Sequence, residues 1–494
     1  MSLPDLIEIV PLDKPVKADI TVPGSKSITN RALILAALAE GETTLEGALW
    51  SEDTQVMVEC LQELGFMVNV APDANEPCNR AITVYGKGGV VPPGGTEAQP
   101  LELFVGNAGT AARFLAAFVC LGKGSYRLHG VPRMHERPQA ELFSALRQLG
   151  FEVESESRNE KLPARIKAPG PIDFPVRFDA STGKPVSTWA RQCSVSIEKS
   201  SQFASALLLC AKAGAWKIDI QGENAEESPY VLMTSSMVEE FSKSAGNFQI
   251  EPDASSGSYF LAAGDLLPHS EETLEYSTEF GMNASTTCFS NVRVANWPNS
   301  GWQIDQNFDG GLILMGIFRE MLELKQSLKV STQAGLAKAA LQQKTRPSAV
   351  VSRRKDLGDS IMTAIVIAPF ADRPIHFTDL GRLRLQECER VSALRAELTK
   401  CGVKVTEEGD TLTVHPSALH GAEIETYDDH RMAMCFAILG LKVPGIKIKN
   451  PACVKKTFPN FFQKLATPPP RGLGATIREG KTGRGLTPEE LFAE

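Results

Sequence analysis

Helical segments that end at a glycine and continue at once into a short strand recur along this chain. Leu61–Val68, Leu146–Val153, Phe241–Phe248 and Leu398–Val405 share the pattern, and 321–330 is a weaker copy without the glycine. Glycine tolerates the left-handed conformation that ends a helix, and the hydrophobic period then changes from about 3.6 residues to 2. The copies lie farther apart than the roughly 20 to 50 residues of a solenoid repeat. The pattern therefore predicts large α/β modules, although an α/β protein without repeats would show the same junctions.

Two segments do not follow this helix-to-strand pattern. The tail 468–494 contains three consecutive prolines and five glycines, a composition typical of an extension that can remain disordered. The stretch from Val330 to Arg354 is rich in cations, as is the residue after it. We interpret this stretch as an insertion or a solvated face. Its cations are Lys344, Arg346, Arg353, Arg354 and Lys355.

The composition is that of a metabolic enzyme. The chain has 494 residues, 43% hydrophobic and 22% charged, so it can bury large cores and should form at least two domains. It carries 51 Lys and Arg against 59 Asp and Glu, a net charge of -8. An acidic chain has no diffuse basic surface, so we expect no nucleic-acid partner. Cations at its motifs are instead expected to converge on the phosphate or carboxylate groups of a small substrate.

Targeting and metal-binding signals are not visible in the sequence. Met1–Val10 has no basic segment and no long apolar run, and apolar stretches such as Ala204–Ala211 are too short to span a bilayer. We therefore expect a cytoplasmic protein without a membrane partner. The 10 cysteines include no Cys-x-x-Cys pair and no Cys/His cluster, so we expect free thiols and no metal site.

Two strand-to-helix turns carry the residues that anion binding requires. Lys26 and Ser27 follow Pro23-Gly24 at the start of a predicted helix, where free backbone N–H groups and the helix dipole favour an anion. In Gly106–Thr110 the small residues let the backbone itself approach a phosphate. A glycine-rich turn of this kind is structural more often than ligand-binding, so neither motif decides the matter alone.

Taken together, seven motifs in order show that the chain resembles the 5-enolpyruvylshikimate-3-phosphate synthase family, from about Val10 to about Leu465. The motifs are Pro23-Gly-Ser-Lys-Ser-Ile-Thr-Asn-Arg31, Leu103-Phe-Val-Gly-Asn-Ala-Gly-Thr110, Pro132-Arg-Met-His-Glu-Arg-Pro138, Ser200-Ser-Gln-Phe203, Asp253-Ala-Ser-Ser256, Tyr427-Asp-Asp-His-Arg-Met-Ala-Met434 and Lys456-Thr-Phe-Pro459.

The resemblance implies a transferase that moves the carboxyvinyl group of phosphoenolpyruvate to the 5-hydroxyl of shikimate 3-phosphate and releases phosphate. This is a step of the shikimate pathway of aromatic amino-acid biosynthesis, and the resemblance implies neither a metal nor an organic cofactor. Its fold is α/β, a two-lobed inside-out α/β barrel with three βαβαββ repeats in each lobe, which close on the substrates. We expect a monomer with a first lobe of 1–22 plus 253–467, a second lobe of 23–252 and an extension of 468–494.

The resemblance also implies the residues that bind phosphoenolpyruvate. A molecule with a phosphate and a carboxylate on adjacent carbons needs several cations, and five of them at motif positions are hard to explain as solvated surface charges. Arginine offers a bidentate fork, whereas lysine acts as a point charge. The implied donor-binding residues are Lys26, Asn107, Gly109, Thr110, Arg137, Gln202, Arg390, Arg431 and Lys456.

Addition to the enol and the following elimination need a base and an acid. Asp359 matches the family's base for the acceptor hydroxyl, and Glu387 matches its acid, with help from Lys26. From the sequence alone, without the resemblance, the preferred interpretation of Asp359 is a helix N-cap, and that of Glu387 is the partner of Arg390 in a surface ion pair.

The implied residues for the acceptor include two serines for its phosphate, Ser200 and Ser201. Gln202 and Tyr230 are expected on the ring side, and His430 is expected to shape a turn. The implied acceptor-binding set is Lys26, Ser27, Arg31, Ser200, Ser201, Gln202, Tyr230, Asp359 and Gln386.

Departures from the family's pattern concern mainly the acceptor. Gln386 stands where the family usually has a lysine, and Glu227 stands where some members have a phosphate-binding serine, although Ser228 is adjacent. Arg382 could restore the lost cation from nearby. Phe114 replaces a common proline in the helix that follows the Gly106–Thr110 turn.

Three alternatives compete with this assignment. A divergent carboxyvinyltransferase paralogue acting on another cyclohexene acid is motivated by Gln386 and Glu227. Transfer to a nucleotide sugar, as in UDP-N-acetylglucosamine carboxyvinyltransferase, is disfavoured because that family has Lys-Asn where this chain has Lys26-Ser27. A binding protein with a relic site is disfavoured because both Asp359 and Glu387 are retained.

Overall fold

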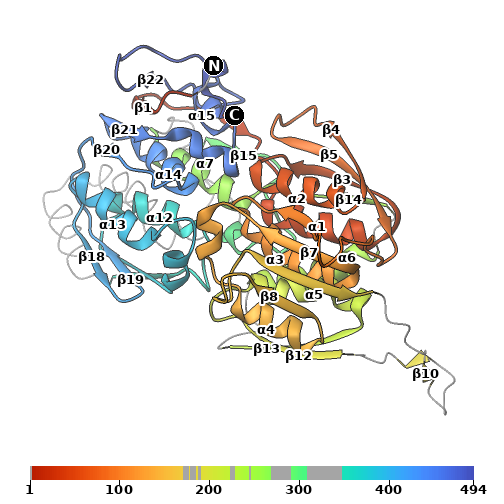
Figure 1. Ribbon diagram of the computed structural model, residues 1–494. Helices are drawn as coiled ribbons and strands as arrows, with labels where there is room; N and C mark the ends of the chain where they lie inside the picture. Colours follow the sequence, from red (N-terminus) through yellow and green to blue (C-terminus); the bar gives the residue numbers. More distant parts are fainter. Residues whose placement is uncertain are drawn as a thin grey trace, which may run out of the picture. The chain divides into compact units, whose positions relative to one another are not determined.

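The computed structural model describes residues 3–170, 177–178, 185–186, 191–222, 229–243, 246–268, 291–308 and 348–493. The chain divides into two compact units. Unit 1 combines Met1–Val22 with Pro252–Glu494, and unit 2 comprises Pro23–Glu251 (Figure 1). The chain thus begins in unit 1, builds all of unit 2 and returns to unit 1.

Unit 2 contains two four-stranded sheets, a parallel pair and a short hairpin among its described residues. The sheets run β14(Asn247–Gln249)-β3(Glu40–Leu49)-β5(Asn79–Lys87)-β4(Met67–Pro72) and β6(Leu101–Phe104)-β7(Lys123–His129)-β9(Ala164–Pro169)-β8(Glu152–Ser155). The pair is β12(Arg191–Ser196) with β13(Trp216–Gln221), and the hairpin is β10(Arg177–Phe178) with β11(Pro185–Val186). The helices are α1(Lys26–Leu38), α2(Glu52–Glu63), α3(Gly109–Phe118), α4(Ala140–Gln148), α5(Gln202–Gly214) and α6(Pro229–Phe241).

Unit 1 has a similar set of sheets. They run β20(Glu423–Ile424)-β21(Ile446–Lys449)-β1(Leu6–Ile9)-β22(Ile477–Glu479) and β16(Ala349–Ser352)-β17(Ile375–Thr378)-β19(Thr411–Val414)-β18(Val405–Glu408), with the parallel pair β15(Val292–Val294)-β2(Ala18–Ile20). The α-helices are α7(Ala254–Leu266), α12(Ile361–Ile367), α13(Arg390–Lys400), α14(His430–Gly440) and α15(Phe461–Ala466). The short 3-10 helices include η2(Pro132–Glu136), η5(Gly381–Leu385), η6(Pro451–Lys456) and η7(Pro488–Leu491).

The four four-stranded sheets repeat one pairing pattern. In each of them the first pair is parallel, as in β6 with β7, and the next two pairs are antiparallel. The predicted helix-to-strand junctions are confirmed: Gly65, Gly150 and Gly402 have φ of 87°, 85° and 88° between a helix and a strand, and Gly246 has φ of 82° directly before β14. The weaker copy predicted at 321–330 lies outside the described residues.

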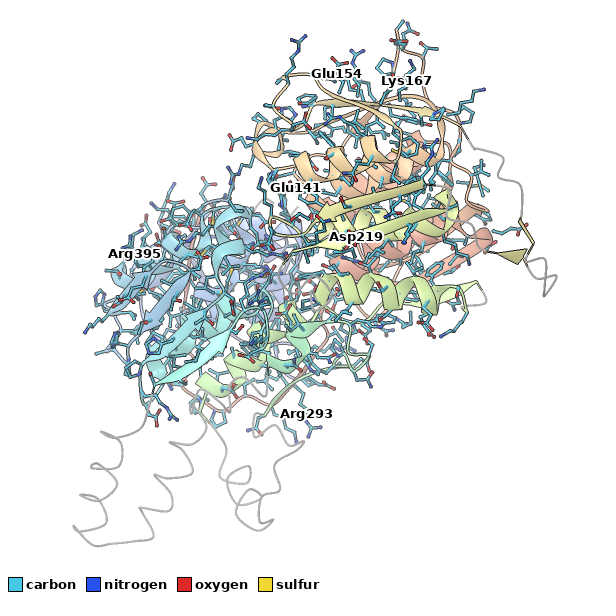
Figure 2. All side chains as sticks on the ribbon, turned by 90° about the horizontal axis from the view of Figure 1, so that it is seen from below. Glu141, Glu154, Lys167, Asp219, Arg293 and Arg395 are labelled. Atoms are coloured by element: carbon cyan, nitrogen blue, oxygen red, sulfur yellow. The ribbon has the colours of Figure 1, made fainter. Side chains whose placement is uncertain are left out.

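Three helices are buried along their whole length. Every residue of α3, α7 and α12 is buried, because their sequences are mostly apolar or small on all sides. A helix buried on all sides can offer polar groups to a ligand only at its ends. The outer sheet faces carry charge instead, and Figure 2 shows Glu154 and Lys167 projecting outward from the sheet β6-β7-β9-β8.

The prediction of a disordered tail is wrong. The segment after α15 forms β22, which pairs with β1, and it buries Leu473, Ile477 and Leu491 to 1% exposure or less. Apolar residues spaced among the glycines and prolines supply this packing, which the overall composition of the tail concealed.

The interpretation of 330–354 as a solvated face is wrong for Arg353, which is 7% exposed. Arg354 and Lys355 are exposed as expected, whereas Lys344 and Arg346 lie outside the described residues. Within the described part of the chain, no helix has the length and apolar character needed to cross a bilayer. Nor do its His, Cys, Asp and Glu side chains gather in a group able to hold a metal ion.

Candidate functional site

The N-terminal halves of four helices of unit 2 meet through side-chain hydrogen bonds. Asn30 in α1 donates from Nδ2 to Thr110 Oγ1 in α3 at 2.9 Å. Arg31 in α1 donates to Ser205 Oγ in α5 at 3.0 Å and to Thr234 Oγ1 in α6 at 2.8 Å. Because each helix begins within a few residues of these contacts, several positive helix ends lie in one region of unit 2. That arrangement favours an anion.

Lys26 begins α1 and already has a carboxylate partner. Its Nζ lies 2.9 Å from Oδ2 of Asp53, in the first turn of α2, and its side chain is 19% exposed. An incoming anion would therefore compete with Asp53 for the charge of Lys26.

Arg31 is held inside the protein in this structure. It is 1% exposed, it donates to the backbone carbonyls of Ser27 and Tyr230, and its guanidinium lies 5.2 Å from the ring centre of Phe114. Burial lowers the pKa of Arg31 to about 10, although Tyr230 acts in the opposite direction. Phe114 stands where the family commonly has a proline. Its ring packs against Arg31, which connects α1 to α5 and α6.

The turn before α3 brings two guanidinium groups to the helix end. Arg137 donates from Nη1 to the carbonyl of Asn107 at 3.2 Å, and Gly106 adopts φ of 52°. A Cβ on Gly109 would lie 2.7 Å from Nη1 of Arg113 and 2.7 Å from Nη2 of Arg137, so only glycine leaves room for both. Arg113 was not predicted; it donates to the carbonyls of Gly109 and Pro138 and holds the turn together.

The serines before α5 lie at another helix start. Ser200 Oγ accepts a hydrogen bond from the Gln202 backbone N–H at 3.3 Å, and Ser201 is 3% exposed. Tyr230 lies in the first turn of α6. Glu227 and Ser228 are outside the described residues.

In unit 1, Asp359 lies among three arginines. Its carboxylate is 2.6 Å from Arg353, 3.4 Å from Arg431 and 3.9 Å from Arg390. Burial alone would raise the pKa of Asp359, but Arg431, Arg353 and Arg390 outweigh it and hold that pKa well below its ordinary value. The cap residue of α12 is Ser360, so the N-cap interpretation of Asp359 is wrong.

Glu387 is close to two predicted donor-binding cations. Its carboxylate lies 2.8 Å from Arg390 Nη2 and 3.4 Å from Lys456 Nζ. Arg390 also donates to both carboxylate oxygens of Asp429, at 2.6 and 3.1 Å. The interpretation of Glu387 and Arg390 as a surface pair is wrong, because the Glu387 side chain is 12% exposed and that of Arg390 is 1% exposed.

A strained turn places Asp429 and Arg431. Tyr427 and Asp428 both have positive φ, 54° and 57°, which is unusual for residues with side chains. Tyr427 donates from its hydroxyl to the buried Glu397 at 2.7 Å, and this bond helps to hold the turn. Asp429 then caps α14 by accepting from the Arg431 backbone N–H at 2.9 Å.

His430 and Gln386 occupy the edges of this cluster. His430 is buried at the start of α14, its Nδ1 3.9 Å from Asp429. Gln386 Oε1 accepts a hydrogen bond from Arg390 Nη1, so the glutamine is in contact with the arginine that also holds Glu387. Arg384, two residues before Gln386, contacts Glu389, Glu407 and Asp410, and these ion pairs hold the segment that carries Gln386 and Glu387.

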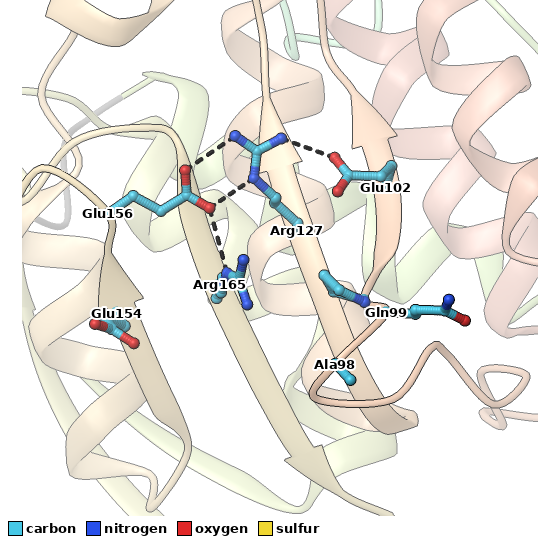
Figure 3. Close-up of a pocket in the computed structure, with 8 residues that line it drawn as sticks. Ala98, Gln99, Glu102, Arg127, Glu154, Glu156 and Arg165 are labelled. Atoms are coloured by element: carbon cyan, nitrogen blue, oxygen red, sulfur yellow. Dashed lines mark hydrogen bonds and ion pairs between the residues drawn. The ribbon is translucent and has the colours of Figure 1, made fainter.

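An open pocket of 810 Å³ elsewhere in unit 2 does not contain the motif residues. It lies over β6, β7, β8 and β9 (Figure 3). Its Arg127 binds Glu156 in a bidentate pair, at 2.6 and 2.9 Å, and Glu102 at 2.9 Å. Because none of its lining residues belongs to the motifs expected to bind substrate, the candidate site is sought in the charged clusters around Lys26 and Asp359.

The structure therefore gathers the predicted residues in two separate sets, one in each unit. The unit 1 set also contains two residues that were not predicted, Arg353 and Asp429. Asp429 could have been suspected from its place beside Arg431 in the motif, whereas Arg353 stood in a run of charges that resembled a solvated face. The unit 2 set is Lys26, Ser27, Arg31, Asn107, Gly109, Thr110, Arg137, Ser200, Ser201, Gln202 and Tyr230, and the unit 1 set is Asp359, Gln386, Glu387, Arg390, Arg431 and Lys456.

Comparisons with known sequences and structures agree on one family. The family profile described as EPSP synthase (3-phosphoshikimate 1-carboxyvinyltransferase) matches residues 11–244 and 277–465. A protein named 3-phosphoshikimate 1-carboxyvinyltransferase from Trichormus variabilis is 35% identical over 481 residues, covering 93% of this chain and 98% of its own. A protein of the same name from Opitutus terrae is 34% identical over 494 residues, covering 94% and 98%.

Solved structures resemble the chain in fold. An EPSP synthase from Acinetobacter baumannii aligns with a TM-score of 0.59 at 19% identity, covering 96% of this chain and 99% of its own. The enolpyruvyl transferase NikO from Streptomyces tendae aligns with a TM-score of 0.56 at 13% identity, covering 97% and 99%. At these identities the alignments establish a shared α/β fold.

Proposed function

Since this chain belongs to the EPSP synthase family, we propose that it transfers the carboxyvinyl group of phosphoenolpyruvate to the 5-hydroxyl of shikimate 3-phosphate and releases phosphate. The observation that carries the proposal is the Arg390 cluster, in which one buried guanidinium contacts Glu387 and lies near Asp359. An acid and a base held around one cation are the groups that addition and elimination at an enol require.

The donor is bound by exchange of ion-pair partners. In the structure, Lys456 pairs with Glu387, Lys26 with Asp53, and Arg431 with Asp359. Buried cations without counter-ions would be costly, so these carboxylates stabilise the site. The phosphate and carboxylate of phosphoenolpyruvate then replace them, with Arg137, Asn107, Gly109, Thr110 and Gln202 completing the donor contacts in unit 2.

This exchange prepares the proton-transfer groups. When a donor anion takes the charge of Arg431, less positive charge acts on Asp359 and its pKa rises, which makes it a better base. When Lys456 turns to the donor, Glu387 loses a cation and holds a proton more readily. Each carboxyl thus gains its function only in the presence of substrate.

The proton movements balance across the two steps. In the addition, the acceptor hydroxyl attacks the central carbon of the donor, its proton goes to Asp359, and Glu387 delivers a proton to the terminal carbon, assisted by Lys26. In the elimination, a proton leaves the new methyl group for Glu387, the bond from carbon to phosphate oxygen breaks, and the leaving phosphate takes up the proton held by Asp359.

The acceptor is assigned to groups of both sets. Ser200 and Ser201 at the start of α5 receive its phosphate, Gln202 and Tyr230 face its ring, and Ser27 and Arg31 serve its hydroxyl and carboxylate groups. Lys26, Asp359 and Gln386 complete the assignment. Because Arg31 is enclosed by α1, α5 and α6, its guanidinium has to exchange internal partners for the acceptor carboxylate.

The divergent-paralogue alternative is not favoured. The relatives that match more than 90% of this chain at 33 to 35% identity over 481 residues are named 3-phosphoshikimate 1-carboxyvinyltransferase. We also propose that each unit contains three βαβαββ repeats, supported by the recurring sheet order. The functional proposal is tested by incubating the protein with both substrates and examining the acceptor by NMR. A carboxyvinyl ether at the 5-oxygen is expected, and its absence would reject the proposal.

A further inference from the structure

The chain continues past the family match and wraps around α15. The family profile ends at residue 465, whereas the described chain runs to 493. The backbone N–H groups of Leu473 and Ala475 donate to the carbonyls of Lys464 and Leu465, at 3.2 and 2.8 Å. A Cβ at Gly472 would lie 2.2 Å from the Thr467 carbonyl oxygen, so the sharp return of the chain requires glycine.

The extension then supplies the outer strand of a sheet. β22 pairs antiparallel with β1, in the register Ile7 with Glu479 and Ile9 with Ile477 (Figure 1). In the other three four-stranded sheets the same outer position belongs to β4, β8 or β18, each of which follows a helix and its terminal glycine. The extension therefore fills a position that the fold occupies elsewhere with one of its own strands.

The end of the extension closes on the segment that carries Lys456. η7 has a capping box between Thr487 and Glu490 and packs against α15, with Leu491 fully buried. The Ala493 backbone N–H donates to the carbonyl of Pro459 at 2.9 Å. Pro459 is three residues after Lys456, so the extension holds the far end of the Lys456–Pro459 segment.

An aromatic cluster connects the same helix to Arg431. Phe461 in α15 lies 5.6 Å from Phe458 and 5.7 Å from Tyr259, measured between ring centres. Tyr259 accepts a hydrogen bond from Arg431 Nη1 at 3.4 Å. Phe461 of the helix beneath the extension thus contacts Phe458, two residues after Lys456, and Tyr259, the hydrogen-bond partner of Arg431.

We propose that residues 467–493, here called the C-terminal clasp, position Lys456 for the donor. The inference rests on the proposed function, because it takes Lys456 as a donor-binding cation. Lys456 is 7% exposed and reaches Glu387 at 3.4 Å, so small shifts of its backbone change which anion it can reach. The competing explanation is that the clasp only adds stability to unit 1.

The test compares variants of the clasp below their unfolding temperatures. Leu491→Ala removes the buried side chain of η7, and deletion of 488–494 removes η7 while keeping β22. Leu491→Met conserves the packing, and Lys481→Ala is an exposed control in the same extension. Hydrogen exchange at residues 451–466 is measured in each protein without substrates, together with KM for both substrates.

A positioning role predicts faster exchange at 451–466 in Leu491→Ala and in the deletion. It also predicts a KM for phosphoenolpyruvate raised about 5- to 10-fold, with a much smaller change for shikimate 3-phosphate. Leu491→Met and Lys481→Ala should resemble the wild type. A lower unfolding temperature with unchanged exchange at 451–466 and unchanged donor KM would overturn the proposal.

The two proposals fail in different ways. If the wild-type protein forms no product, the proposed function is wrong, and the exchange measurement still decides whether the clasp holds the Lys456 segment. If the wild type is active but exchange and donor KM do not respond to the deletion, only the clasp proposal is wrong. The deletion retains β22, so a loss of the sheet edge does not obscure the result.

Discussion

Arg353 Nη2 lies 2.6 Å from Oδ1 of Asp359, the shortest of the three arginine contacts to this carboxylate. Both side chains are nearly buried, so the pair is weakly screened by water. Arg353, which the sequence placed in a run of solvated charges, therefore contacts Asp359, the proposed catalytic base.

Replacing Arg353 should change the pH dependence of the reaction. Arg353→Gln removes a cation that helps to lower the pKa of Asp359, so that pKa should rise. The base must be deprotonated to act, and the acidic limb of kcat/KM against pH is therefore expected to move to higher pH. The control is Arg354→Gln, because Arg354 is 43% exposed and lies 3.7 Å from a different carboxylate, Asp379. An identical acidic limb in both variants would contradict the role of Arg353.

The same pair should affect stability at low pH. A carboxyl with a lowered folded-state pKa stabilises the protein above its unfolded pKa of about 3.9, and this contribution is lost as the pH falls towards the folded value. Removing one partner of a buried ion pair costs about 3–5 kcal/mol. Arg353→Gln should therefore lower the free energy of unfolding most at neutral pH, with a smaller difference from wild type at the most acidic pH. Urea unfolding at several pH values measures this, and a constant difference would count against the pair.

Asp359→Asn should abolish most of the turnover while preserving the shape of the side chain. Loss of a general base is expected to lower kcat by roughly 10²- to 10⁴-fold, with a smaller effect on donor binding. Single-turnover kinetics separate the chemical step from binding. Turnover near the wild-type value would show that another group accepts the hydroxyl proton.

Lys456 and Lys455 form a matched pair of adjacent lysines. Lys456 is buried beside Glu387, whereas Lys455 is exposed. Lys456→Ala should raise KM for phosphoenolpyruvate roughly 10- to 150-fold, the equivalent of about 1.5–3 kcal/mol for a charged hydrogen bond. Lys455→Ala should leave it almost unchanged. Equal effects of the two substitutions would remove Lys456 from the donor site.

Gln386→Lys tests how the acceptor phosphate is recognised. A new charge-assisted contact would tighten shikimate 3-phosphate by up to roughly 10- to 150-fold. The gain should be smaller here, because Gln386 Oε1 accepts from Arg390 and a lysine would repel that guanidinium. Arg382→Ala is the companion variant, and it should be the more damaging one if Arg382 supplies the missing charge. If neither variant changes the kinetics with shikimate 3-phosphate, recognition does not depend on this segment.

The sequence predicted those structural features that depend on residues adjacent in the chain. The glycine junctions were identified because one residue type, with its left-handed φ, ends a helix and begins a strand. The motif residues were found because the resemblance placed them. Arg353 was missed because burial depends on distant segments, and a charge run offers no local sign of it. The tail was misjudged because average composition conceals apolar positions such as Ile477 and Leu491 that pack on β1 and α15.

Phosphate release with phosphoenolpyruvate and shikimate 3-phosphate, compared with the same donor and unphosphorylated shikimate, tests the central claim most directly. The account predicts rapid release only with the phosphorylated acceptor, since Ser200 and Ser201 are assigned to that phosphate. Faster release with the unphosphorylated acid, or no release with either acceptor, would contradict it.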